Sequence, residues 1–301
     1  MYNLNGIYKS ERVGFMLKKI GTLILSICLL VPGSTVLAAN NSNTEEPIVN
    51  NEAINYWKGK FDSFEDQINS GNLGALVGSS EIYIKYTPKN ENIDLETATE
   101  DDFNKLVFDK DGYVSERLKE VSPFAIGPFE PNGTCSWLRL DLQVYETSTR
   151  GIYSAISFWE WKTDPQFRLK DINGIYVSSE LGIGEVTPTN PKVAEFRFRE
   201  TNSNTWTVRR PFVSVSQYGN GAATTIDLPG DSELFNHDYF MGMLQVPVEF
   251  VNTGSTAGRI YTCYSHTRLS VGDLSFDSEG KPSFGITSKI DEFSGSVRIT
   301  K

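Results

Sequence analysis

The sequence has 301 residues, of which 39% are hydrophobic and 12% aromatic, and its formal net charge is −10. This is the composition of a folded, water-soluble chain, and it excludes a disordered chain, a collagen repeat and, with three cysteines, a disulfide-dense scaffold. The acidic balance also argues against nucleic acid as a partner, because binding to phosphates starts from a basic surface.

The first predicted element is a secretory signal peptide that ends at residue 38. A basic segment that starts at Met16 precedes an apolar run of 12 residues over 20–31, and small residues follow up to Ala38. The run is shorter than the ~20 residues that span a bilayer. We therefore expect a true start at Met16, a secreted, extracellular protein, and no integral membrane segment in the mature chain. Cleavage removes four basic residues and one acidic residue, so the net charge becomes −13.

The mature chain divides into three predicted parts. Residues 39–51 are polar and rich in Asn, which is typical of a flexible leader. Residues 52–130 have the pattern of a small α+β region, and residues 131–301 that of an antiparallel β-sandwich. The two folded parts are expected either to be separate or to share one core, since a region of ~80 residues has little apolar surface to spare.

Within the α+β region, the spacing of four apolar side chains predicts a helix over 52–69. These side chains are Trp57, Phe61, Phe64 and Ile68. Gly59 inside the helix costs about 1 kcal/mol of propensity, and Gly71 supplies a C-cap. A strand is predicted at 81–87, and short helices are predicted at 99–107 and 114–121 before a proline-rich loop.

From residue 133 onward the pattern changes to period-2 alternation. Leu and Val alternate with polar residues over 135–145, which predicts a half-buried strand. Six more runs have the same texture: 152–161, 175–179, 193–200, 205–215, 243–251 and 259–267. Turn residues separate them, Asn173 and Gly174 among them. Many short strands favour an antiparallel β-sandwich, with an open β-barrel as the alternative.

Two cysteines, Cys135 and Cys263, remain after cleavage of the signal peptide. Because secreted proteins meet an oxidising environment, the sequence predicts a disulfide between them. Two buried free thiols are the alternative.

The strand at 152–161 ends in an unusual group: Trp159, Glu160, Trp161 and, after a short gap, Asp164. Alternation places the two indoles on one face and Glu160 on the other. One hypothesis is an aromatic platform for a sugar ring or another flat ligand, oriented by Glu160 or Asp164. The alternative is that the indoles fill the sandwich core while Asp164 and Pro165 begin a turn.

A basic, aromatic segment follows over 193–211. If residues 201–204 form a hairpin loop, three cross-strand pairs are expected. The pairs are Arg199 with Trp206, Arg197 with Val208, and Glu195 with Arg210. Phe196 and Phe198 then share the opposite, buried face. The alternative is an anion site built from Arg197, Arg199 and Arg210.

The sequence contains no motif that identifies an enzyme. The two histidines, His237 and His266, have no zinc-ligand spacing, and no G-x-S-x-G segment is present. The run from Asp109 to Val114 matches the middle of a calcium loop but lacks its first and last ligands, so a plain turn is expected. The sequence therefore predicts no metal, no cofactor and no identifiable catalytic residue.

The leading functional hypothesis is an extracellular binding protein whose partner is a carbohydrate or a cell-surface component. The alternative is an extracellular hydrolase that acts on glycans with two paired carboxylates. A third hypothesis is a membrane-active β-protein, because 214–226 and 251–262 are rich in Ser, Thr and Gly.

Overall fold

The structure is a computed structural model. It describes residues 51–89, 92–98, 136–162, 165, 170–200, 203–229, 237–267, 273–284 and 290–301. Several predicted features lie outside the described residues: the signal peptide, the leader up to residue 50, the helices at 99–107 and 114–121, the turn at Asp109, Cys135 and Asp164.

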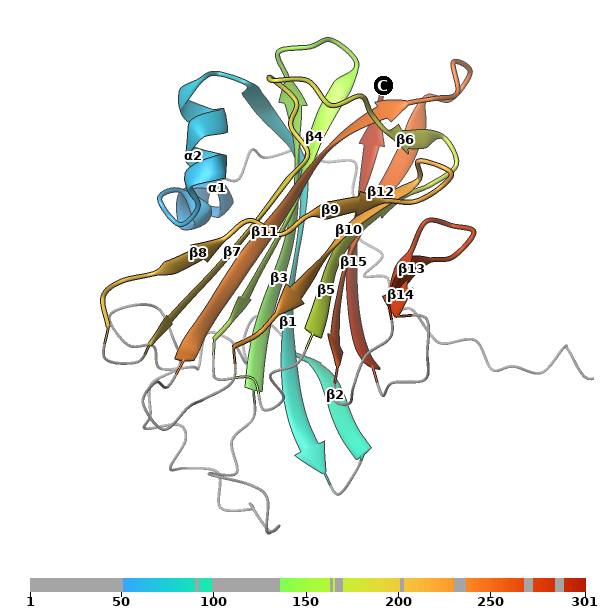
Figure 1. Cartoon of the computed structure of the whole chain (residues 1–301). Coiled ribbons are helices and arrows are strands. Elements are labelled where there is room, and N and C mark those ends of the chain that lie inside the picture. Colours follow the sequence, from blue (N-terminus) through green and yellow to red (C-terminus); the bar gives the residue numbers. More distant parts are fainter. Residues whose placement is uncertain are drawn as a thin grey trace, which may run out of the picture. The chain divides into compact units, whose positions relative to one another are not determined.

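Two antiparallel sheets face each other and form a β-sandwich (Figure 1), which confirms the predicted fold class. The large sheet has the order β2-β1-β3-β4-β11-β7-β8, and β6 pairs with β11. Its strands are β1 (Leu73–Lys89), β2 (Asn92–Ala98), β3 (Ser136–Thr147), β4 (Ile152–Trp161), β6 (Leu181–Ile183), β7 (Val193–Glu200), β8 (Thr207–Arg209) and β11 (His237–Phe250).

The small sheet has the order β15-β12-β5-β10-β9. Its strands are β5 (Lys170–Val177), β9 (Val213–Val215), β10 (Gly221–Asp227), β12 (Ala257–Thr267) and β15 (Ile290–Thr300). A separate hairpin of β13 (Leu274–Phe276) and β14 (Pro282–Phe284) packs on its outer face through Phe284, which contacts Ile172 and Ala223.

The core between the sheets follows directly from the alternation of each strand. In β3, the residues at even positions from Leu138 to Val144 are all buried against the small sheet. Aliphatic side chains fill one part of this core, and aromatic side chains fill the other.

The outer face of the large sheet is also covered, by the helices α1 (Asn51–Trp57) and α2 (Asp62–Asn69) (Figure 1). Trp57, Phe61 and Phe64 are fully buried there, and Trp57 stacks on Phe158 of β4 with ring centroids 4.8 Å apart. Because the helices cover this part of the outer face, the outward-facing carboxylates Asp141 and Glu160 are buried as well.

The predicted helix over 52–69 is wrong in one respect, because the structure has two helices there. Gly59 lies between them with φ of 80°, a left-handed conformation that glycine adopts readily. This break lets the chain turn so that Trp57, Phe61 and Phe64 still reach the same sheet face. The predicted cap is confirmed, since Gly71 has φ of 72° just after α2.

Among the strands, β4 and β7 have the predicted bounds, whereas the predicted strand at 205–215 is divided into β8 and β9. The predicted turn at Asn173 and Gly174 is wrong, because both residues lie inside β5. Gly174 is there for packing: a Cβ atom at this position would lie 2.3 Å from Pro282 Cγ.

The strand β1 belongs to the segment that the sequence analysis assigned to the α+β region. It pairs with β3 from Leu73 to Tyr86, so it is part of the large sheet of the sandwich. The described residues of both segments therefore share one core.

Candidate functional site

The structure places Trp159 and Trp161 in the core between the sheets, with no exposed surface on either indole. Trp159 lies against Phe196 and Tyr264, and the Nε1 atom of Trp161 donates a hydrogen bond to the Tyr264 hydroxyl at 3.1 Å. The hypothesis of an exposed aromatic platform is therefore wrong for these side chains in this structure, and the core interpretation holds. Among the described residues of the group, Glu160 faces the other way.

A buried polar network lies beside these indoles. The Tyr264 hydroxyl donates to Asp171 Oδ2 at 2.5 Å, and His266 Nδ1 lies 3.0 Å from both carboxylate oxygens of Asp171. All three side chains are buried. His266 is therefore a buried core histidine held by the Asp171 carboxylate.

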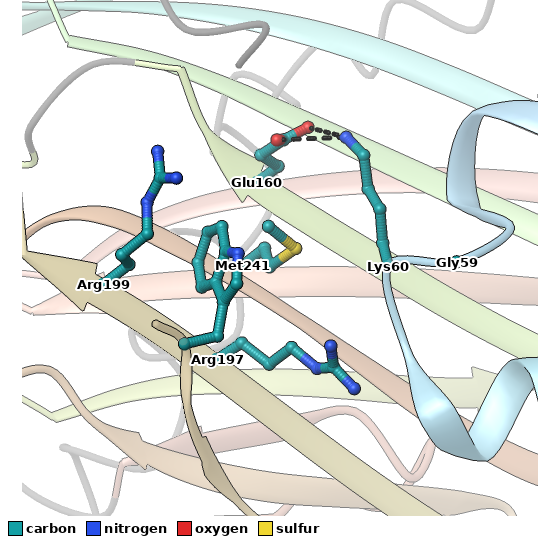
Figure 2. Close-up of a pocket in the computed structure, with 7 residues that line it drawn as sticks. Gly59, Lys60, Glu160, Arg197, Arg199 and Met241 are labelled. Atoms are coloured by element: carbon teal, nitrogen blue, oxygen red, sulfur yellow. Dashed lines mark hydrogen bonds and ion pairs between the residues drawn. The ribbon is translucent and has the colours of Figure 1, made fainter. Parts of the chain in front are cut away.

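On its outer face, the large sheet and the turn between the two helices enclose a pocket of ≈ 210 Å³. We call it the outer-face pocket, and it is lined by Gly59, Lys60, Glu160, Arg197, Arg199, Trp206 and Met241. In Figure 2, Lys60 extends from the helix turn toward Glu160 of β4, and the arginines extend from β7, which β11 separates from β4. Three of the lining side chains are cationic and one is anionic, so the lining is positive in a chain of negative net charge.

Glu160 is fully buried at one side of the pocket and holds two ammonium groups. Its carboxylate oxygens lie 3.2 Å and 3.3 Å from Lys60 Nζ, and Oε2 lies 2.9 Å from Lys162 Nζ. Oε2 also accepts a hydrogen bond from the Tyr56 hydroxyl at 2.5 Å. These partners compensate the cost of burying the carboxylate and tie α1 to β4.

The Tyr56 ring lies between two cations. Lys60 Nζ is 3.7 Å from the ring centroid, and the Arg139 guanidinium is 3.6 Å from it. Beside them, Trp57 Nε1 donates a hydrogen bond to Asp141 Oδ2 at 2.7 Å. The helix is therefore attached to the sheet by directional polar contacts as well as by its apolar face.

Glu195 of β7 fixes the start of α2. Phe61 at the N-cap has no side chain that could accept a hydrogen bond, and the Glu195 carboxylate takes that role by accepting from the Ser63 backbone N–H at 3.2 Å and the Ser63 hydroxyl at 2.8 Å. The same carboxylate lies 2.6 Å from Arg197 Nε. The Glu195 carboxylate therefore connects Arg197 to the start of α2 at the rim of the pocket.

The hairpin register predicted for β7 and β8 is confirmed. Arg197 pairs with Val208, and the Arg199 guanidinium lies 5.0 Å from the ring centroid of Trp206. The Nη2 atom of Arg210 lies 3.8 Å from Oε2 of Glu195. This register brings two arginines and an indole to one face of the sheet, where they line the outer-face pocket.

Lys60 and Lys162 were not predicted as partners of Glu160. Each contact between Lys60 and Glu160 spans 100 residues, so no local pattern could connect them. Gly59 inside the predicted helix was the one signal for this contact. A helix that breaks at Gly59 directs the next side chain, Lys60, toward a different surface. Asp164, the remaining member of the predicted group, lies outside the described residues.

Beneath α1, two carboxyl groups have pKa values that move in opposite directions. Burial alone would raise the pKa of Glu160, but the two lysines and the tyrosine around it outweigh burial and lower the pKa from 4.5 to about 2. At Asp141 burial dominates over the hydrogen bonds and the nearby guanidinium, and it raises the pKa from 3.8 to about 6.

These shifts predict two opposite effects of pH on stability. A carboxyl whose pKa is raised on folding stabilises the folded state as the pH falls, so Asp141 adds about 3 kcal/mol between about pH 7 and pH 4. Glu160 stabilises fully above pH 4.5, and about 3 kcal/mol is lost as the pH falls from there toward 2. Urea unfolding at several pH values measures both effects.

Two variants separate them. The difference in free energy of unfolding between wild type and Asp141→Asn should change between pH 7 and pH 4, and the difference between wild type and Glu160→Gln should change below pH 4.5. Differences that stay constant with pH would contradict the assignment.

Cys263 is a buried free thiol in this structure, and burial raises its pKa. Its expected partner, Cys135, lies outside the described residues, so the disulfide stays a prediction. Within the described ranges, no group of three His, Cys, Asp or Glu side chains is placed to hold a metal ion.

The sequence matches no protein-family profile and no curated protein. Many solved structures resemble parts of the chain, and three of them serve as examples. They are the collagen-binding domain of a Staphylococcus aureus adhesin (9% identity, TM-score 0.24, 48% of this chain and 86% of that one), Clostridium perfringens delta-toxin (9%, 0.24, 71% and 92%) and a pore-forming protein (10%, 0.26, 56% and 94%). At these identities and TM-scores, the similarity carries no information about function.

Proposed function

We propose that this protein is an extracellular binding protein that holds an acidic sugar in the outer-face pocket. The observation that carries the proposal is the convergence of Lys60, Arg197 and Arg199 with the Trp206 indole on one small pocket. The cationic side chains can bind the acid group of such a ligand, and the indole can contact its sugar ring.

The arginines supply the selectivity for an acid group. A guanidinium is planar and can donate two parallel hydrogen bonds to a carboxylate or a sulfate. Arg199 is 6% exposed and lies between the rings of Trp206 and Tyr239, with its guanidinium 4.3 Å from the Tyr239 centroid. Its direction is therefore fixed before a ligand enters, which reduces the entropy cost of binding.

The indole and the size of the pocket favour a single sugar ring. Trp206 is partly exposed at the pocket, so one part of the ring can contact the apolar C–H groups of a sugar. The volume of ≈ 210 Å³ is below the ~300 Å³ at which pockets for drug-sized ligands begin. A terminal or single acidic residue fits this size better than a larger compound.

The extracellular location rests on the sequence pattern over 16–38. In the part of the chain that the structure describes, no helix is both long and apolar enough to cross a bilayer.

The binding test compares an acidic sugar with a neutral one of the same shape. We expect methyl glucuronide to bind and methyl glucoside not to bind in isothermal titration calorimetry, with affinity that falls as salt is added. Loss of one charge-assisted hydrogen bond costs about 1.5–3 kcal/mol, so Arg199→Gln should weaken binding by about 10- to 100-fold.

Arg298→Gln is the matched control, because Arg298 is exposed on β15 of the small sheet. It removes the same charge from the protein without touching the pocket. Equal affinities of the two arginine variants, or equal binding of the acidic and neutral sugars, would refute the proposed function.

A further inference from the structure

Lys60 occupies a position in the outer-face pocket that differs from that of an ordinary surface lysine. Its Nζ atom lies 3.7 Å from the Tyr56 ring centroid and 5.1 Å from that of Trp57. Its side chain is only 24% exposed, and it lines the pocket. The amine is thus largely shielded from water by aromatic rings while it borders a cavity that a small molecule can enter.

Burial is the main effect that favours loss of the proton from this amine. Burial lowers the pKa of Lys60 to about 8, and the ammonium of Lys162 and the guanidinium of Arg139 act in the same direction, against the carboxylate of Glu160. At about pH 7.5, a lysine of pKa 8 has roughly 200 times more free amine than one at the ordinary value.

We propose that Lys60 is a covalent binding site for carbonyl compounds, which it captures as an imine within the outer-face pocket. The geometry of the amine carries this proposal. The preference for a carbonyl compound that also has an acid group, such as the open-chain form of a uronic acid, rests on the proposed function.

The step needs no oxidant or reductant. The Lys60 ammonium releases one proton to solvent, and the nitrogen lone pair forms a bond to the carbonyl carbon. The carbonyl oxygen takes up two protons, one from the nitrogen and one from solvent, and leaves as water, and the last proton on the nitrogen is released to solvent. The C=N bond of the imine replaces the C=O bond, and the arginines hold the acid group of the same ligand.

The test traps the imine on the intact protein. Incubation with glyoxylate, an aldehyde with a carboxylate, or with glyceraldehyde, a neutral aldehyde, is followed by reduction with cyanoborohydride to a stable amine. Peptide mass spectrometry then gives the labelling rate at each lysine. Lys58 is the matched control, because it is exposed and lies two residues away on the same turn.

We expect glyoxylate to label Lys60 at least tenfold faster than Lys58, and excess methyl glucuronide to slow this labelling. Arg199→Gln should slow labelling by glyoxylate more than labelling by glyceraldehyde. If Lys60 reacts no faster than Lys58 with either aldehyde, the proposal is overturned.

A third result separates the two proposals. If both aldehydes label Lys60 preferentially and at the same rate, and Arg199→Gln has no effect on either, the reactive lysine stands. The acid-binding function is then the one refuted.

Discussion

Glu160→Ala is expected to lower the free energy of unfolding by about 3–5 kcal/mol, because removing one member of a buried ion pair strands its partners. Two ammonium groups, Lys60 and Lys162, share the Glu160 carboxylate, and the Tyr56 hydroxyl donates to it as well. Without the carboxylate, the two positive charges face each other in a site that water barely reaches. Urea unfolding monitored by circular dichroism measures the loss.

Glu279→Ala provides the comparison, since Glu279 is exposed in the turn between β13 and β14. This substitution should change the free energy of unfolding by less than about 0.5 kcal/mol. Similar values for the two variants would mean that Glu160 is solvated in solution, and the arrangement of α1 over β4 described above would then be wrong.

The burial of Glu160 shows which features of the fold could be predicted from the sequence and which could not. Period-2 alternation correctly separated Glu160 from the two neighbouring indoles, because successive side chains of a strand point to opposite faces. Alternation does not show which faces are covered. The helices cover the outer face of the large sheet, so Glu160 is as buried as Trp159 and Trp161.

Part of the outer-face pocket could also be predicted from the pattern of the strands. Arg197, Arg199 and Trp206 were expected on one face, because a four-residue hairpin loop fixes the register of the strands that it joins. Lys60 and Gly59 come from a turn more than a hundred residues earlier in the chain. Their placement depends on how the helices pack on the sheet, and local propensity carries no information on that packing.

Trp159→Ala is expected to destabilise the protein by about 3–5 kcal/mol, the cost of removing a large aromatic side chain from a packed core. The indole stacks against Phe196 with ring centroids 5.8 Å apart, and its centroid lies 5.0 Å from that of the Tyr264 ring. Gly242 on the paired strand makes room for it, since a Cβ atom there would lie 2.5 Å from Trp159 Nε1. Gly242 has no side chain that could fill the space left by the indole.

Trp206→Ala is the matched variant, because it removes the same side chain from the rim of the pocket and leaves the core intact. We expect it to cost less stability than Trp159→Ala, because Trp206 is only partly buried against the apolar cluster under the helices, and to weaken the binding of methyl glucuronide. Trp159→Ala, studied under conditions where it remains folded, should retain that binding, because its indole faces the opposite side of the sheet. The reverse pattern, in which loss of Trp159 abolishes binding in a folded protein and loss of Trp206 does not, would restore the aromatic platform and refute the outer-face pocket.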